Sequence, residues 1–481
     1  MKEQLQDILS LLTDQGADYA DIRVHDIQEE NIATENNKVQ SLSTAHTYGY
    51  GIRVFVDGAL GFAGSQEFEN MEATAKRALA IARASRGAQK QPARLAPRQA
   101  VVDDYQTPVK IDPFTVSKEQ KLALLFAAEA EMRKAVPDLF KTFGSLLFRR
   151  EEKIFADTEG AYITQTLFMS GGGIEATAAN QQDVQKRSFP NSFRGDYGTA
   201  GYEYVEELGL VENAARVARE AKALLEAEEC PSGHFDLVID SDQLTLQIHE
   251  SIGHPIELDR VFGHEAGLAG TSFLNPDKLG FRYGSEHVNV VADATVPQGL
   301  GTFGYDDEGV KAQRTPIITK GIFANFISSR DTASVLNQPS NGTARADGWG
   351  RIPIVRMTNI NLLPGDKEVD ELIAGVEYGF YLATNKSWSI DDKRLNFQFA
   401  CEIAYEIKDG KLTGKIFKNP IYTGITPEFW NACDGVASEK HWQLHGTPNC
   451  GKGEPMQVAR VGHGSAPARF RNIKVGVADV K

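Results

Sequence analysis

The chain has 481 residues, of which 41% are hydrophobic and 24% charged, and its formal net charge is -14. This is the composition of a globular protein with enough apolar material for buried cores, and the length suggests about three domains. The acidic balance disfavours binding to nucleic acid phosphates and to anionic membrane surfaces. No apolar run approaches the ~18 residues of a membrane span. The four cysteines are widely spaced, which fits a reducing cytoplasm better than a disulfide framework.

Strand and helix signals alternate over the first 230 residues. Asp57-Gly58 has the residue types of a tight hairpin turn, and Asn70 to Ala84 carries an apolar stripe at helical spacing. The other elements predicted there are strands at 22–24, 51–55, 144–149, 153–157 and 162–169 and helices over 118–135 and about 205–227. A hairpin followed by a helix thus occurs twice, which indicates a weak internal repeat.

The pattern changes after the turn Pro231-Ser232-Gly233. The segment 235–240 predicts a buried strand and 241–253 a helix, whereas the sequence beyond Glu286 is mostly β-rich. Tight turns such as Asp409-Gly410 join these β-rich segments, which predicts a largely antiparallel sheet or barrel.

The predicted fold is α+β. An N-terminal α/β part with hairpins and long helices precedes a C-terminal, largely antiparallel β domain. We place the boundary between residues 1–230 and 231–481. The repeat suggests two similar subdomains, 1–110 and 111–230, within the first part.

The segment HESIGH carries the strongest chemical signal. His249 and His254 are zinc-type ligands, and Glu250 beside the first is a candidate general base. The histidines of the usual zinc-peptidase helix are four residues apart and share one face. These are five apart, which places them roughly 140° apart on a regular helix. A π-type bulge would bring them together, and so would a helix that ends at Gly253, where glycine and the following Pro255 relax the backbone.

In this interpretation Glu250 takes a proton from a metal-bound water and passes it to the leaving amine. The motif is short enough to arise by chance, and two histidines near a helix end also serve as caps. The residues alone leave the third ligand open. His264 and Glu257 follow the motif, and Cys450 lies in the glycine-rich segment PNCGKGEP, where backbone and metal can approach closely. Cys433 fits better as a small buried apolar group.

An acidic run, Asp306, Asp307 and Glu308, lies in the segment YDDEG. One interpretation is a loop beside a groove in which backbone edges pair with an extended peptide. The simpler one is a solvated turn. We expect the solvated turn and leave these residues out of the site.

Several segments together resemble the TldD/PmbA family of metallopeptidases, also called modulators of DNA gyrase. HESIGHPIELD is similar to the family's HExxxH helix, and RMTNINLLPG and NCGKGEP are similar to its later motifs. The central segment from DATVPQGLGTFGYDDEG to SSRDTA and the N-terminal hairpin YGYGIRVFVDGALGFAGS are also similar. Because unrelated motifs occur in the same order over nearly the whole chain, the resemblance is specific.

The resemblance implies a zinc peptidase of the TldD-like catalytic branch, since PmbA-like members lack the HExxxH motif. It implies His249, His254 and Cys450 as the Zn²⁺ ligands and Glu250 as the base. It also implies paired subunits, as a homodimer or as a heterodimer with a PmbA-type partner, and unfolded or extended peptides as substrates. A thiolate ligand would make the site less electrophilic than three histidines would, so we expect modest peptidase activity.

Two other functions compete with the peptidase. The first is a non-catalytic regulatory or binding subunit with a structural metal, which would need a fourth protein ligand such as His264 or Glu257. The second, direct modulation of gyrase or DNA, follows from the family label alone and is opposed by the net charge. We expect a cytoplasmic protein that binds neither nucleic acid nor membranes.

Overall fold

The computed structural model describes residues 1–88, 91–267 and 270–476. The N-terminal strands are β1 (Tyr19–Glu35), β2 (Lys38–Val56), β3 (Ala59–Ser65), β4 (Val102–Gln106), β5 (Lys141–Asp157), β6 (Tyr162–Ala179), β7 (Val184–Phe189) and β8 (Asp196–Gly198). They form one eight-stranded sheet in the order β3-β2-β1-β5-β6-β4, and β7 and β8 also pair with β6. Each pair is antiparallel except that of β4 with β6.

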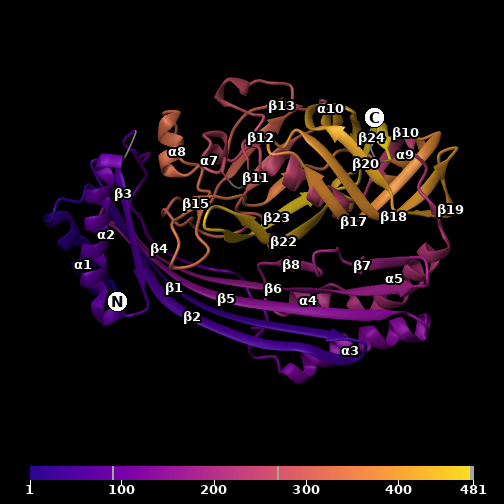
Figure 1. Cartoon of the computed structure of the whole chain (residues 1–481), viewed down its shortest axis with the longest axis horizontal. Coiled ribbons are helices and arrows are strands. Elements are labelled where there is room, and N and C mark those ends of the chain that lie inside the picture. The colour runs from indigo at the N-terminus through magenta and orange to yellow at the C-terminus, as the bar shows by residue number, and fades with distance from the viewer. Residues whose placement is uncertain (89–90, 268–269, 477–481) are drawn as a thin grey trace.

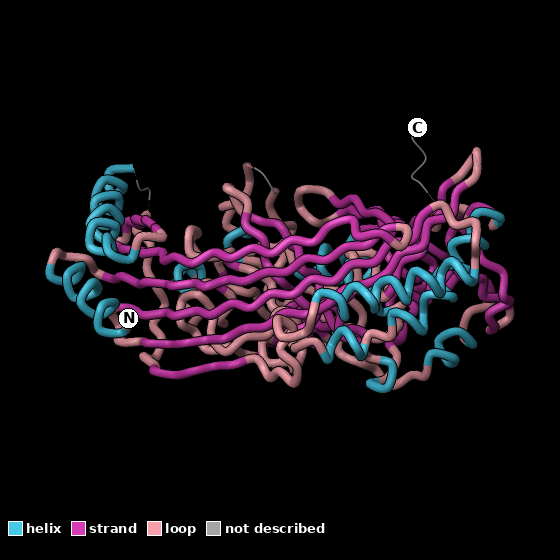
Figure 2. The backbone as a smooth tube through the Cα atoms, turned by 90° about the horizontal axis from the view of Figure 1, so that it is seen from below, coloured by secondary structure: helices cyan, strands magenta, loops and turns pink. Residues whose placement is uncertain are grey.

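Helices cover this sheet at its two ends, as Figure 2 shows from below. They are α1 (Lys2–Asp14), α2 (Met71–Ser85), α3 (Lys118–Ala135), α4 (Glu203–Glu207) and α5 (Leu210–Glu226). One apolar core lies under α1 and α2, and another under α3 and α5. The apolar stripe predicted from the sequence, which includes Met71, Ala78 and Ala82, is the buried face of α2, because its helical period turns every member toward the sheet.

The long strands extend past the short ones that the sequence predicts. The two strands predicted between residues 144 and 157 are one strand, β5. Its central charged residues pair with the neighbouring strand β1: Arg149 donates to Glu29, and the Glu151 Oε1 atom lies 2.7 Å from His25 Nδ1. These charged side chains pair between strands and do not alternate with apolar residues. The alternation of apolar and polar residues therefore did not predict this middle part of β5.

Positive φ angles mark the turns. Asp57 and Gly58 have φ of 49° and 74°, as a type I′ hairpin turn requires, so the turn predicted between β2 and β3 is confirmed. Gly209, with φ of 66°, separates α4 from α5, where the sequence predicted one helix from about 205 to 227.

The C-terminal part is built from several mostly antiparallel sheets. The largest contains β9 (Glu228–Glu229), β10 (Gly233–Ile239), β17 (Tyr378–Ile390), β18 (Asn396–Lys408), β19 (Lys411–Lys418), β20 (Ile421–Ile425), β21 (Cys433–Val436) and β24 (Ala468–Val475). The smaller sheets contain β11 (Val290–Asp293), β12 (Arg314–Thr319), β13 (Ile322–Phe323) and β16 (Ile360–Leu362); β14 (Ala344–Arg345) and β15 (Ile354–Val355); and β22 (Gln443–Lys452) and β23 (Gln457–Ser465). The helices are α6 (Ser241–Ile248), α7 (Leu258–Val261), α8 (Arg330–Val335), α9 (Val369–Ala374) and α10 (Thr426–Asn431). The predicted α+β class is confirmed.

Figure 1 shows the N-terminal sheet as a long curved layer with the C-terminal sheets stacked on its concave side. The largest apolar core lies in the C-terminal part and includes Leu244 and Ile248 of α6 and Val461 of β23. This core holds α6 against the hairpin of β22 and β23. Within the described residues, no helix is both long and apolar enough to cross a membrane.

Candidate metal centre

Helix α6 continues into a π turn that brings the two predicted histidines together. The π-helix covers His249–Gly253, and the His254 N–H donates to the His249 carbonyl oxygen at 3.1 Å. A bond between residues five apart places them on one side of the helix, and the two ring centroids lie 4.8 Å apart. Of the two backbone solutions that the spacing allows, the π bulge is the one present.

Gly253 serves a different purpose from the one predicted. It does not have a positive φ, and His254 keeps helical φ and ψ of -68° and -40° although Pro255 follows it. A Cβ atom at Gly253 would lie 2.1 Å from the Sδ atom of Met357. The glycine is therefore needed because the π turn packs against Met357, and not because its backbone is unusual.

Cys450 reaches the histidines from the hairpin of β22 and β23. The strand register shifts between Thr447 and Cys450, so β22 bulges immediately before the cysteine. The Cys450 Sγ atom lies 3.8 Å from His254 Nε2, and one ligand atom from each of the three residues lies within 4.8 Å of the others. In tetrahedral zinc a nitrogen at about 2.1 Å and a sulfur at about 2.3 Å are about 3.6 Å apart. The Cys450–His254 pair nearly has this spacing, and the three donors, within 4.8 Å of one another, would close in around a zinc ion.

The second ring nitrogen of each histidine is held by a neighbour. His254 Nδ1 lies 2.9 Å from Glu257 Oε2, and His249 Nδ1 lies 2.7 Å from His463 Nε2. His463 Nδ1 in turn lies 3.2 Å from the carbonyl oxygen of Ile360. When His463 donates to that carbonyl, its Nε2 accepts from His249. Both ligand histidines then keep Nε2 as the free lone pair, which is the tautomer that a metal requires.

Burial and nearby charges set the protonation of the donors. Burial lowers the pKa of His249 and lowers that of His254 well below the ordinary value, so both rings are neutral near pH 7. Burial raises the pKa of the Cys450 thiol, but the Arg356 guanidinium and His254 more than offset it, and the resulting pKa is lower than that of an ordinary cysteine. Neutral imidazoles beside a favoured thiolate are suited to zinc.

The predicted base, Glu250, is buried in the π turn and forms an ion pair with Arg394. Arg394 lies in the turn between β17 and β18 and has a φ of 62°. Its N–H donates to the Asp391 carbonyl oxygen, and its own carbonyl accepts from the Thr426 hydroxyl. Because the turn is held at both ends, the guanidinium fixes the orientation of the Glu250 carboxylate.

The other residues considered as a third ligand do not join the donor group. Glu257 contacts His254 at Nδ1, away from the Nε2 atom that faces Cys450, and also pairs with buried Lys452 at 3.3 Å. His264 is exposed. Cys433 is buried in the C-terminal apolar core, as its sequence environment predicts.

Three residues of this centre were not predicted from the sequence: His463, Arg394 and Arg356. Each lies far from HESIGH in the chain and reaches the centre through tertiary structure. A hairpin predicted over residues 443–465 would have placed His463 on the same face of its strand as Ala459, which pairs with Cys450. Proline and several glycines in that segment weakened the strand signal.

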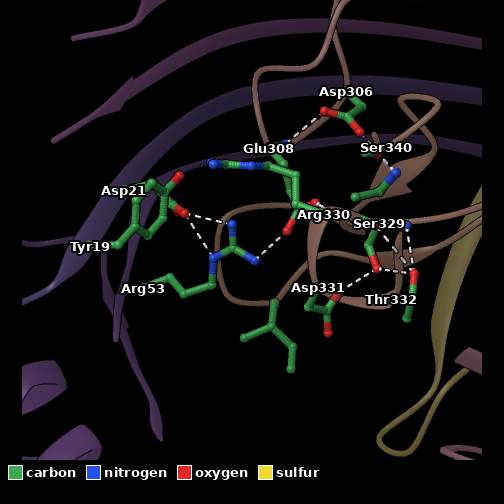
Figure 3. A network of polar contacts seen from close by, with 12 residues as sticks. Tyr19, Asp21, Arg53, Asp306, Glu308, Ser329, Arg330, Asp331, Thr332 and Ser340 are labelled. Carbon is green, nitrogen blue, oxygen red and sulfur yellow. Dashed lines mark hydrogen bonds and ion pairs between the residues drawn. The ribbon is translucent and has the colours of Figure 1, made fainter. Parts of the chain in front are cut away.

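The acidic run is not a solvated turn, so that prediction is wrong. Asp306, Asp307 and Glu308 are buried, with exposed fractions of 2%, 3% and 1%. Glu308 pairs with Arg53 of the N-terminal sheet at 2.7 Å, as Figure 3 shows, and Asp307 pairs with Lys153. Burial, aided by Glu308, raises the pKa of Asp306 to about 8. The run joins the C-terminal part to the N-terminal sheet.

Three family models match consecutive parts of the chain. They are domain 1 of the PmbA/TldA metallopeptidases over residues 20–82, the central domain over 111–225 and the C-terminal domain over 232–477. The chain belongs to the PmbA/TldA metallopeptidase family. The resemblance drawn from the motifs is confirmed, and the C-terminal family domain contains every residue of the candidate centre.

Relatives of this PmbA/TldA protein carry metalloprotease names. A metalloprotease of Methanothermobacter thermautotrophicus is 31% identical over 95% of each chain. A metalloprotease TldD homolog of Haemophilus influenzae is 26% identical over 98% of this chain and 96% of its own. A zinc metalloprotease TldD homolog of Saccharolobus solfataricus is 27% identical over 51% of this chain and 52% of its own. These names support a metallopeptidase.

Solved structures share the fold of this PmbA/TldA protein. A Thermotoga maritima protein described as a modulator of DNA gyrase has a TM-score of 0.78 at 18% identity, covering 99% of this chain and 100% of its own. TldE from Thermococcus kodakarensis has a TM-score of 0.76 at 16% identity, covering 98% and 100%. At these identities the likeness shows the fold alone.

Proposed function

We propose that this PmbA/TldA protein is a zinc-dependent peptidase with His249, His254 and Cys450 as metal ligands. The donor geometry carries the proposal: three zinc-type donors converge from a π turn and a hairpin, and the second nitrogen of each imidazole is bonded. Two imidazoles and a thiolate favour zinc over harder cations. The name of the Saccharolobus relative supports the same metal.

Glu250 is the proposed general base. A zinc ion with three protein ligands supplies a Lewis acid and an open position at which a water becomes more acidic. Glu250 accepts a proton and passes it to the leaving amine, while Arg394 holds its carboxylate. The negative charge of the Cys450 thiolate makes the centre less electrophilic, so we expect modest rates of hydrolysis.

The proposed substrates are unfolded or extended peptides. The three donors and Glu250 are only 4–6% exposed. A cavity of about 760 Å³ between the N-terminal layer and β17 is lined by Leu147, Trp388 and Asn449, and Asn449 directly precedes Cys450. We infer that an extended chain reaches the buried groups from this side, because a folded domain is too wide to bring its backbone to groups this deep.

Metal analysis and one variant test the proposal. Protein purified without a nickel column should hold about one zinc per chain, and Glu250→Gln should keep the metal but lose most peptidase activity. Absence of near-stoichiometric metal, or full activity of Glu250→Gln, would overturn it. A protein that binds zinc yet cleaves no peptide, alone or with a partner, would support the alternative of a non-catalytic subunit with a structural metal.

A second subunit is proposed from an unpaired strand edge. β2 pairs with β3 only over Tyr50 to Val56, so within the described residues its outer edge from Ser41 to Gly49 has no neighbouring strand. The segment is mostly exposed, with Leu42 at 44%, and it contains no proline, lysine or acidic residue of the kind that protects natural edges. We propose that a second copy or a PmbA-type partner pairs there, and the structural likeness to TldE is consistent with the latter.

We also propose the division of the chain into residues 1–230 and 231–481. In the first part, 1–110 and 111–230 would be subdomains whose strands join through β1 and β5 into one sheet. A cytoplasmic location is proposed because all four cysteines are free thiols.

A further inference from the structure

A serine, a histidine and an aspartate form a hydrogen-bonded chain outside the metal centre. The Ser241 Oγ atom lies 3.2 Å from His445 Nε2, and His445 Nδ1 lies 2.9 Å from Asp196 Oδ2. The other oxygen of Asp196 accepts from the amides of Tyr197 and Gly446, which fixes the carboxylate. With its Nδ1–H donated to Asp196, His445 presents Nε2 as an acceptor for the serine proton. The Ser241 hydroxyl also lies 3.1 Å from Gln443 Oε1, so it has two acceptors, of which only His445 can take the proton as a base.

Ser241 stands at a turn from strand to helix. β10 ends at Ile239, Asp240 caps the helix, and Ser241 is the first residue of α6. The Ser241 amide donates to Asp240, whereas no hydrogen-bond partner among the described residues accepts from the amides of Asp242 and Gln243. Such amides in the first turn of a helix stabilise negative charge. The turn therefore joins a hydroxyl group to donors suited to an oxyanion.

The three residues line a cavity of about 700 Å³, which is large enough for a small organic ligand. Asp240 and Asp242 also line it; Asp240 accepts from the Ser241 amide and Asp242 from the Thr384 amide and hydroxyl, but within the described part of the chain neither lies in an ion pair. The cavity's arginines, Arg187 and Arg216, are both paired with Glu220. Two carboxylates without a cationic partner favour a ligand that carries a positive charge.

We propose that Ser241, His445 and Asp196 form a second, metal-independent catalytic centre that hydrolyses small esters with a positively charged acyl group. Ser241 Oγ attacks the carbonyl carbon while His445 Nε2 takes the hydroxyl proton. The alcohol leaves with that proton, and the acyl group remains on the serine. Water, deprotonated by His445, then attacks the acyl carbon; the acyl–Oγ bond breaks, His445 returns the proton to Ser241 Oγ, and the carboxylic acid leaves. Ser241 precedes His249 by eight residues, roughly 12 Å along a helix, whereas His445 is paired across the hairpin with His463, which contacts His249; the two centres are therefore separate but adjoin through the hairpin.

Labelling with a fluorophosphonate tests the proposal on the full chain after treatment with a chelator. Ser241 Oγ would form a P–O bond as the P–F bond breaks, with fluoride leaving and the serine proton passing to His445. Burial lowers the pKa of His445, but the Asp196 carboxylate raises it by more, so the resulting pKa is above that of an ordinary histidine. The reaction is run at pH 8.5 so that the imidazole is neutral and can act as a base. We expect one label per chain, mapped to Ser241 by peptide mass spectrometry.

Matched variants decide whether the three residues act together. Ser241→Ala should abolish labelling, and His445→Gln should slow it at least about 100-fold. Ser465→Ala is the control, because Ser465 is buried and donates to the Ser241 carbonyl without joining the chain, and it should label at the unsubstituted rate. An unlabelled protein, a label on another residue, or equal rates with and without His445 would overturn the proposal. If a variant does not fold, the position of the label on the unsubstituted protein, found by peptide mass spectrometry, decides the outcome.

Ester hydrolysis provides a second measurement. In the presence of the chelator, the 4-nitrophenyl ester of 4-(trimethylammonio)butanoic acid should be cleaved, and cleaved faster than that of its neutral isostere 5,5-dimethylhexanoic acid, because only the former carries a permanent positive charge for Asp240 and Asp242. Loss of this activity on chelation would assign it to the metal site and contradict the proposal.

Discussion

Glu257 offers a sharp test of how the metal centre is held. Its Oε2 atom lies 2.9 Å from His254 Nδ1, and Glu257→Gln keeps the shape of the side chain while removing its charge. Loss of a carboxylate that orients a ligand histidine typically lowers metal affinity 10- to 100-fold, or by about 1.4–2.7 kcal/mol. We therefore expect Glu257→Gln to bind Zn²⁺ about 10- to 100-fold more weakly in competition with a chromophoric chelator at pH 7.5.

Glu265→Gln is the matched control. Glu265 is also buried and pairs with Arg260 at 3.3 Å and Lys452 at 3.6 Å, two cations that Glu257 contacts as well, but it does not touch His254. Both variants disturb the same buried charges, so their metal-free stabilities should fall together in chemical denaturation. Only Glu257→Gln should lose zinc affinity. Equal zinc affinities of the two variants would refute the reasoning.

The remaining predictions concern stability and assembly. Arg53→Met should lower the free energy of unfolding in urea by about 3–5 kcal/mol, because two buried carboxylates lose their partner. Lys76→Met, at an exposed ion pair, should change it little. Equal losses of unfolding free energy in the two variants would contradict this. Leu42→Lys should shift sedimentation of the protein toward the monomer, and the similarly exposed Ile81→Lys should not. Burial lowers the pKa of the buried histidines of the metal centre, so they are protonated more readily in the unfolded chain. The free energy of unfolding of metal-free protein should therefore fall as the pH drops below about 6.5, by up to about 1.4 kcal/mol per pH unit for each histidine. Equal denaturation midpoints at about pH 7.5 and 5.5 would argue against this.

The local elements of this fold follow closely from local signals. The helix predicted over 118–135 has the bounds of α3, because Ser117 and Gln120 form a capping box that fixes its start. The turn at Asp57-Gly58 is found because its residue types accept positive φ. The π bulge was one of two backbone conformations predicted for the five-residue spacing of the histidines. The close packing of Gly253 against Met357, a residue distant in the chain, is not visible in any local pattern.

Features that depend on pairing between distant segments could not be predicted. The acidic run at Asp306 is buried because cations arrive from the N-terminal sheet, more than 150 residues away in the chain, so composition alone favoured a solvated turn. His463 and Arg394 reach the metal centre only through the register of their strands and turns. The role of Cys450 was similarly undecided until the family resemblance was considered, because bulged, glycine-rich strands give weak signals.

Zinc K-edge X-ray absorption on the purified protein tests the central claim most directly. We predict one sulfur at about 2.3 Å and two imidazole nitrogens at about 2.0–2.1 Å around the metal. In Cys450→Ser the sulfur shell should disappear while the imidazole signals remain. A spectrum of the unsubstituted protein without a sulfur shell, or a sulfur shell that persists in Cys450→Ser, would contradict the assignment of His249, His254 and Cys450 as the ligands.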